Sequence, residues 1–191
     1  MLAEVRNTCG VPAIVPPRLS DGTVSLRGLT PGDVPDIVAA CRDPEIPRWT
    51  RVPSPYTRED AKRFVAAVTA EAASGHGVAL ALCDPGTDRL IGTVGVMEVD
   101  RAAGYCEIGY WTAAPARGRG LTSRAVALVR DWAHAELGAT TVELLPHGDN
   151  LPSQRVAERA GFTDTGEVRR VPRMPPGRRD GYKVYVWRAP A

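Results

Sequence analysis

The chain of 191 residues has the length of one ordinary domain, and its 43% hydrophobic and 24% charged residues are typical of a chain with a real core. Its 24 basic and 22 acidic side chains leave a formal net charge of +2, which argues against general attraction to nucleic acid or membrane surfaces. No apolar run approaches the roughly 20 residues of a membrane span. Residues 1–19 also lack the pattern of a signal peptide, so we expect a soluble protein of the cytoplasm.

The cysteines and histidines indicate neither disulfides nor a metal site. Cys9, Cys41, Cys83 and Cys106 show no C-x-x-C spacing, and three of the four lie in apolar surroundings. We therefore expect reduced, partly buried thiols. Only three histidines occur, and none lies at ligand spacing from a cysteine, so no metal is predicted.

The N-terminal part predicts an arm, a strand and a helix. Residues 1–19 are rich in proline and lack periodicity, which indicates an arm preceding a single domain over residues 20–191. Alternation over residues 23–29 predicts a first strand. Thr30, followed by proline and by an acidic residue in the first turn, predicts the start of a helix that runs to about Arg42.

The middle of the chain predicts a loop, a helix and three strands. The four prolines of residues 43–56 indicate an ordered loop, and Thr57-Arg58-Glu59-Asp60 predicts the start of a helix that runs to about Ala73. Short turns rich in Asp, Gly and Ala then separate three strand candidates, which favours antiparallel pairing. These candidates are residues 78–83, 90–99 and 105–112.

The C-terminal part alternates helices and strands. Apolar residues at helical spacing begin at Leu121, and Gly138 ends that helix. The elements expected after it are a strand over residues 140–145, a helix from Asn150 to about Ala160, and strands over residues 162–172 and 182–188. The predicted class is α/β (α+β), with a mixed, mostly antiparallel sheet of six or seven strands and about four helices.

The loop between residues 112 and 121 has the composition of a phosphate site. It follows a strand, opens a helix and reads T-A-A-P-A-R-G-R-G-L. Glycines allow close approach of the backbone, and a helix N-terminus attracts anions. Arg117 and Arg119 could add charge-assisted contacts. A tight turn without a ligand is the alternative, whereas Walker A and Rossmann loops are excluded because their lysine and third glycine are missing.

Together with its flanking residues, this loop resembles a known family. Arg117-Gly118-Arg119-Gly120-Leu121-Thr122 is similar to the [Q/R]-x-x-G-x-[G/A] signature of the GNAT superfamily of acyl-CoA N-acyltransferases, although Thr122 replaces the usual Gly or Ala. Glu107–Trp111 resembles the E-I-G-Y-W strand of the branch of ribosomal-protein N-terminal acetyltransferases (RimJ/RimL-like). Asn150-x-x-Ser153 and Gly161-Phe162 match that branch as well. The close resemblance covers residues 105–162, and the order of elements fits over residues 22–189.

The resemblance implies a GNAT fold that uses acetyl-CoA, or another acyl-CoA, as co-substrate without a metal. The strand before the loop would hold the pantetheine arm, the loop N–H groups would bind the pyrophosphate, and Asn150 would face the thiol end. The implied donor-binding residues are Tyr110, Trp111, Thr112, Arg117, Gly118, Arg119, Gly120, Leu121, Thr122, Asn150 and Ser153.

The implied reaction is attack of a neutral amine on a thioester. Glu107 is the candidate base, and a solvated or salt-bridged carboxylate is the alternative. Ser153 is the candidate acid toward the departing thiolate, or else a first-turn residue that bonds the helix backbone. Many GNAT enzymes place a tyrosine further along this helix, where Ala157 stands here. A main-chain N–H at Trp111 or Thr112 would stabilise the oxyanion.

The acceptor side is the least defined part of the prediction. Trp49 and Tyr56 could line an acceptor pocket or serve only in packing, and the basic run over residues 169–179 could contact the acceptor or be a solvated loop. The expected acceptor is the amine of a protein N-terminus, an amino acid or a small molecule, and the protein is expected as a monomer or homodimer. The alternative function is a non-catalytic acyl-CoA sensor or interaction module on the same fold.

Overall fold

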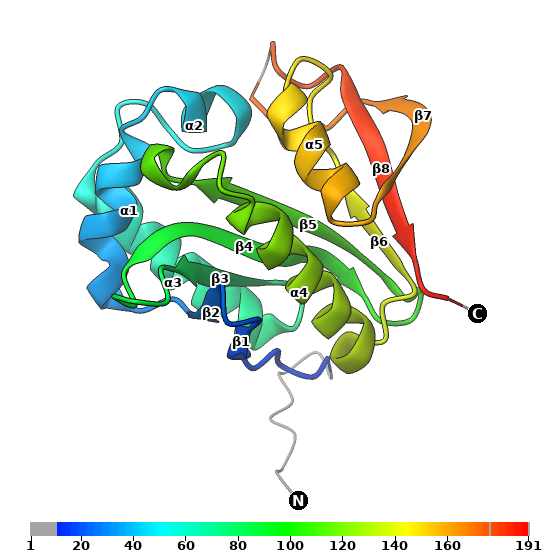
Figure 1. Ribbon diagram of the computed structural model, residues 1–191, viewed down its shortest axis with the longest axis horizontal. Helices are drawn as coiled ribbons and strands as arrows, with labels where there is room; N and C mark the ends of the chain where they lie inside the picture. The colour runs from blue at the N-terminus through cyan, green and yellow to red at the C-terminus, as the bar shows by residue number, and fades with distance from the viewer. Residues whose placement is uncertain (1–10, 176, 191) are drawn as a thin grey trace, which may run out of the picture.

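The computed structural model describes residues 11–175 and 177–190, which form a single mixed sheet covered by helices (Figure 1). The strand order is β1-β2-β3-β4-β5-β6-β8-β7, and every neighbouring pair is antiparallel except β5 and β6. The strands are β1 Leu19–Ser20, β2 Ser25–Gly28, β3 Val78–Cys83, β4 Leu90–Asp100, β5 Tyr105–Thr112, β6 Thr141–Leu144, β7 Thr163–Arg169 and β8 Tyr182–Arg188.

The helices cover both faces of the sheet. Figure 1 shows α4 and α5 in front of the sheet and α3 behind it. Buried residues of α4 and α5 share one core with β2 to β6, while α1, α2 and α3 share a second core with the other face. No helix among the described residues is long and apolar enough to cross a bilayer. The helices are α1 Val34–Cys41, α2 Glu45–Trp49, α3 Arg58–Ser74, α4 Leu121–Leu137 and α5 Leu151–Arg159.

The predicted class is confirmed, but the described residues contain eight strands and five α-helices, which is more than the sequence indicated. The additional strand β1 has two residues, too few for alternation to be recognised. The additional helix α2 lies in the segment expected as a loop. Pro44 precedes this helix and Pro47 lies in its first turn, where a missing N–H costs no hydrogen bond.

The capping signals fall where they were expected. The N–H of Asp60 donates to the hydroxyl of Thr57 at 3.2 Å, and the N–H of Thr57 donates back to the Asp60 carboxylate at 2.8 Å. In the expected arm, Ile14 is buried and its N–H donates to the carbonyl of Ala72. Residues 1–10, including Cys9, lie outside the described residues. Cys41, Cys83 and Cys106 are free and buried, as predicted.

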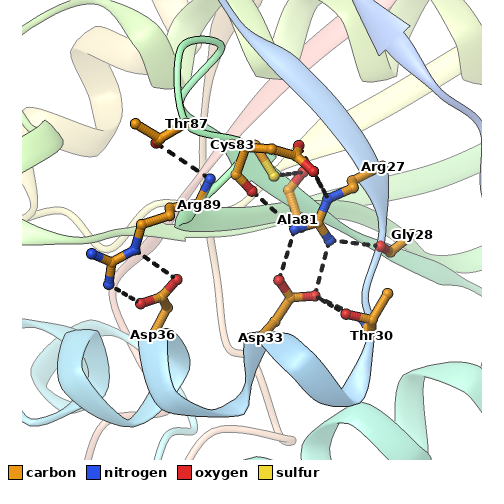
Figure 2. A network of polar contacts seen from close by, with 10 residues as sticks. Arg27, Gly28, Thr30, Asp33, Asp36, Ala81, Cys83, Thr87 and Arg89 are labelled. Atoms are coloured by element: carbon orange, nitrogen blue, oxygen red, sulfur yellow. Dashed lines mark hydrogen bonds and ion pairs between the residues drawn. The ribbon is translucent and has the colours of Figure 1, made fainter.

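An ion pair fixes the start of α1 to the sheet (Figure 2). Arg27 on β2 donates to both carboxylate oxygens of Asp33, at 2.9 and 2.8 Å, and also contacts Asp88 in the turn after β3. The side chains of Arg27 and Asp33 are only 12% and 5% exposed. A second pair, Arg89–Asp36, lies beside it, but its arginine is 72% exposed. The two pairs therefore differ in burial, and Asp33 also accepts hydrogen bonds from the N–H and hydroxyl of Thr30.

Replacing Asp33 by asparagine is expected to lower the free energy of unfolding by about 3 kcal/mol, because the buried Arg27 loses its buried counter-ion and keeps only the exposed Asp88. The matched substitution Asp36→Asn in the exposed pair is expected to cost under about 1 kcal/mol. Urea unfolding followed by circular dichroism measures both values. Equal losses in the two variants would contradict the assigned role of burial.

The same pair predicts a pH dependence of stability. Burial alone raises the pKa of Asp33, but hydrogen bonds from Arg27 and Thr30 outweigh burial and hold the pKa below its usual value. The folded carboxyl therefore binds its proton more weakly than the unfolded one. The stabilisation is present above the unfolded pKa of about 3.9 and is lost as the pH falls through the folded pKa. The difference between wild type and Asp33→Asn should shrink below that pH.

Candidate active site

The site begins where β5 and β6 separate, which Figure 1 shows clearly. Parallel pairing joins only Tyr105–Glu107 of β5 to Thr141–Glu143 of β6, whereas β5 continues to Thr112 along β4. In the described part of the chain, no strand pairs with the β6 side of residues 108–112. An extended ligand with amide groups can pair with this open backbone as an added strand would. We call this open side of residues 108–112 the slot.

The loop after β5 presents free N–H groups at the start of α4. Gly118 and Gly120 have φ values of 74° and 76°, which favour glycine, and a Cβ on either would meet no atom within 4 Å. No side chain caps the helix at Gly120. Among the described residues, the N–H groups from Gly118 to Ser123 have no acceptor. Such a helix N-terminus is suited to an anion such as a pyrophosphate.

The arginines of the loop have different surroundings. Arg117 donates to the carbonyl of Thr112 at 2.9 Å and pairs with Asp43 at 2.7 Å, so its side chain fastens the loop. Arg119 has no hydrogen bond or ion pair within the described residues and is free to meet a phosphate. The hydroxyl of Thr122 bonds that of Thr112 at 2.9 Å. This bond gives the unusual threonine a structural use, since it joins the helix start to the strand end.

The other expected donor contacts lie at the edges of the same slot. The Leu121 side chain is buried in the core, so only its N–H can face a ligand, while Trp111 is 9% exposed and lines a cavity beside the strand. Asn150 caps α5, because its side-chain oxygen accepts from the N–H of Ser153 at 3.2 Å. The Ser153 hydroxyl bonds that of Tyr110 at 2.6 Å. Burial raises the pKa of Tyr110, which keeps its hydroxyl protonated.

Glu107 lies on the opposite face of β5 from Tyr110, because side chains alternate along a strand. It is 5% exposed and forms an ion pair with Arg173, from the loop between β7 and β8. Burial raises the pKa of Glu107, and Arg173 offsets this only in part. A carboxylate with a raised pKa in a cavity is a better proton acceptor than an ordinary one.

One cavity of about 580 Å³ contacts both faces of β5. Glu107 lies in its wall, and Asn150 and Ser153 line it beyond the end of β6. The expected substrate-side residues Trp49 and Tyr56 line it too, although Tyr56 is mostly buried. The structure thus brings the predicted catalytic and acceptor residues to one space. Other lining side chains are Phe64, Met97, His147, Met174 and Tyr182.

Two segments that are distant in sequence meet beside Trp49, His147 and Tyr182, which line this cavity. The ring of His147 lies 5.7 Å from that of Trp49 and 5.4 Å from that of Tyr182. Arg178, in the loop before β8, donates to the main-chain oxygens of Pro47 and Arg48 at the end of α2. This contact, the Arg178 clasp, joins the loop before β8 to α2.

The sequence did not identify Arg173 as a partner of Glu107. The basic run over residues 169–179 was expected as a solvated loop or an acceptor contact, yet Arg173 and Arg178 both bond within the protein. A carboxylate in an apolar strand is a usable signal, because a buried charge needs a partner. The sequence shows that need but not which arginine meets it.

Residues 23–163 match the acetyltransferase (GNAT) domain. The chain belongs to the GNAT acetyltransferase family. A segment of 84 residues is 40% identical to the Probable N-acetyltransferase YjcK of Bacillus subtilis, and it covers 44% of this chain and 46% of that protein. The chain thus spans about half the length of this relative.

Solved GNAT structures share the fold at low sequence identity. RimJ of Mycobacterium smegmatis, in complex with CoA-disulfide, superimposes with a TM-score of 0.77 at 18% identity and covers 93% of this chain and 87% of that chain. Spermidine N-acetyltransferase of Vibrio cholerae, in complex with CoA and spermine, gives 0.72 at 17%, with 88% and 96% covered. The slot and the free loop N–H groups fit the donor of this GNAT domain, acetyl-CoA. Among the described residues, no three potential ligands gather as a metal site.

Proposed function

We propose that this GNAT protein transfers an acetyl group, or a related acyl group, from CoA to the primary amine of a protein N-terminus, an amino acid or a small molecule. The observation that supports this proposal is the continuity of the site. The slot beside β5 leads into one cavity, with Glu107 in its wall and the Ser153–Tyr110 pair beyond the end of β6.

The proposed mechanism is direct attack through a tetrahedral intermediate. The pantetheine arm pairs with β5 near Tyr110 to Thr112, and loop N–H groups bind the pyrophosphate. Glu107 takes the proton of the acceptor's ammonium, directly or through water, and the neutral amine attacks the thioester carbon. A main-chain N–H at Trp111 or Thr112 stabilises the oxyanion. The carbon–sulfur bond then breaks, and the nitrogen gives up the extra proton that it carries after the attack. The Ser153 hydroxyl passes its proton to the thiolate and takes up this proton in exchange, so that it ends as a neutral hydroxyl.

The lining of the cavity favours a single amine on an apolar body. Two of the three lining carboxylates already pair with arginines, Asp60 with Arg63 and Glu107 with Arg173. Only Glu71 has no such pair among the described residues. A polyamine with several charges would need more free carboxylates than this. Apolar residues, both aliphatic and aromatic, make up most of the remaining lining.

Calorimetry with acetyl-CoA and a thiol-release assay test this function. The assay uses an alanine-starting peptide, phenethylamine and spermidine as acceptors. We expect acetyl-CoA binding, and faster thiol release with one of the two monoamines than with spermidine. Failure to bind acetyl-CoA at millimolar concentration would overturn the proposal. Binding without release from any acceptor in a wide amine panel would favour the acyl-CoA sensor instead.

Replacing Ser153 by alanine is expected to lower kcat by about 10-fold or less, because a thiol with a pKa near 8.5 can leave without full protonation. The Ser153 N–H still bonds Asn150 in this variant, so α5 keeps its cap. Tyr110→Phe is the matched variant, since it removes the other hydroxyl of the pair. A loss of more than about 100-fold in kcat would give Ser153 a larger share of general acid catalysis than we assign.

The remaining assignments are part of the same proposal. We place the protein in the cytoplasm as a monomer or homodimer, with no nucleic acid or membrane as partner. The division into an arm over residues 1–19 and a domain over residues 20–191 also remains a proposal. Size-exclusion chromatography with light scattering checks the oligomeric state.

A further inference from the structure

Two buried carboxylates lie side by side where β5 and β6 are still paired. Glu107 and Glu143 are register partners in the parallel ladder. Their side chains are only 7% and 11% exposed. Two like charges this close in a poorly solvated place disfavour each other's ionisation, so each needs a cation.

One segment supplies both cations. Arg169, at the end of β7, bonds Glu143 at 2.7 Å, and Tyr105 also donates to that carboxylate at 2.9 Å. Arg173, four residues later, pairs with Glu107. Only one of the two pairs lies in the cavity wall: Glu107 and Arg173 line the cavity, whereas Glu143 and Arg169 do not.

The segment that carries Arg173 is well held. The N–H of Val171 donates to the carbonyl of Arg179 at 2.6 Å, and the Arg179 side chain donates to the carbonyl of Met174 at 3.0 Å. Val171, Met174 and Tyr182 form a small apolar cluster under the loop. Arg173 thus reaches Glu107 from a loop that these hydrogen bonds and this apolar cluster hold in place.

We propose that Arg173 is a positioning residue for the transfer: it holds the Glu107 carboxylate charged and directed toward the cavity, ready for the proton of the acceptor's ammonium. This inference rests on the proposed function, because it takes Glu107 as the base. The loop before β8 then has two contacts, because it also bonds α2 through the Arg178 clasp.

The other charges around Glu107 do not replace Arg173. Glu98 on β4 and Glu143 on β6 both raise the pKa of Glu107, as does burial, and Arg173 is the cation that lowers it. Burial raises the pKa of the neighbouring Tyr105 and Cys106, which therefore stay neutral. The charged groups of α3 that line the cavity are Asp60, Arg63 and Glu71.

Replacing Arg173 by methionine is expected to raise the pKa of Glu107 by about 1 to 3 units, the usual effect of removing a close opposite charge. Carbon NMR of carboxyl-labelled glutamate measures this pKa, and the spectrum of Glu107→Gln assigns the signal. Because the ionised form is the base, the acid limb of kcat/KM should move to higher pH by the same amount. The pH profile of kcat/KM is measured with the amine that reacts fastest in the acceptor screen. The titration of this amine affects all variants equally, so it cancels from the comparison.

Two further variants separate positioning from simple structure. Arg173→Lys restores the charge and should return the limb toward its wild-type position. Arg169→Met removes the neighbouring arginine, which acts on Glu107 only through Glu143, and should therefore move the limb much less than Arg173→Met does. Melting temperatures and acetyl-CoA binding confirm that each variant is folded.

The outcomes are distinct. An unshifted limb and an unshifted Glu107 signal in Arg173→Met would overturn the positioning role while leaving the proposed function intact. Equal shifts in Arg173→Met and Arg169→Met would overturn it too, since the effect would then be general. Full activity in Glu107→Gln would remove Glu107 as the base, and the role of Arg173 would fall with that part of the proposed function.

Discussion

Replacing Glu107 by glutamine is expected to lower kcat/KM by between about 100-fold and 10,000-fold, the range that a positioned general base contributes. Glutamine keeps the size of the side chain, so the cavity and the strand remain as they are. Arg173 loses its counter-ion but is 28% exposed and can be solvated. Acetyl-CoA affinity should be unchanged, because Glu107 lies away from the loop N–H groups. Thiol release and calorimetry measure the two quantities.

Glu143→Gln is the control for this prediction. Glu143 is the register partner of Glu107 and also pairs with an arginine, but it does not line the cavity. If the loss of any buried carboxylate lowered kcat/KM by destabilising the fold, Glu143→Gln would lower it too. Wild-type kcat/KM in Glu107→Gln, or equal losses in both variants, would contradict the role of Glu107 as base.

Replacing Gly120 by valine is expected to weaken acetyl-CoA binding by about 100-fold, because the loss of one or two charge-assisted hydrogen bonds costs about 1.5–3 kcal/mol each. A Cβ at Gly120 meets no protein atom, so a side chain there projects into the open space in which we propose that the pyrophosphate binds. The φ of 76° also strains any other residue and shifts the neighbouring N–H groups. Calorimetry with acetyl-CoA measures the loss.

The other end of the same helix offers a matched control. Gly138 ends α4 with a φ of 72°, and a Cβ there also meets nothing within 4 Å. Gly138→Val therefore adds similar backbone strain, and the two variants should lose similar thermal stability. Only the variant at Gly120 should lose acetyl-CoA affinity. Comparable losses of affinity at both positions would show that α4 matters through stability and not through its N-terminus.

The donor half of the candidate site could be proposed from the sequence because it is nearly continuous. Strand, loop and helix follow one another from Glu107 to Thr122, so local spacing indicates a tight turn or a phosphate site at a helix N-terminus, and the family resemblance favours the second. Asn150 and Ser153 were proposed from the same resemblance. The capping residue Thr57 was predictable for the same reason: its partner Asp60 is three positions away.

The proposed acceptor half was harder to infer from the sequence because its cavity depends on contacts between distant segments. Trp49 and Tyr56 were expected near it, yet the short helix α2 was hidden by its prolines. The pairing of Arg173 with Glu107 joins residues 66 positions apart, and no local pattern selects one arginine from several. The strand β1 was missed for a different reason: two residues have no periodicity to detect.

The Arg178 clasp has a consequence for how this enzyme can diverge. The hydrogen-bond acceptors of Arg178 in this contact are the main-chain oxygens of Pro47 and Arg48, and every residue type carries such an oxygen. Side chains of α2 can therefore change without removing this contact. Four residues from Trp49 to Val52 line the cavity that we propose for the acceptor, so variation in residues 45–52 offers a route to new acceptor preferences. Combinatorial libraries in this short window are thus a natural starting point for retuning its selectivity.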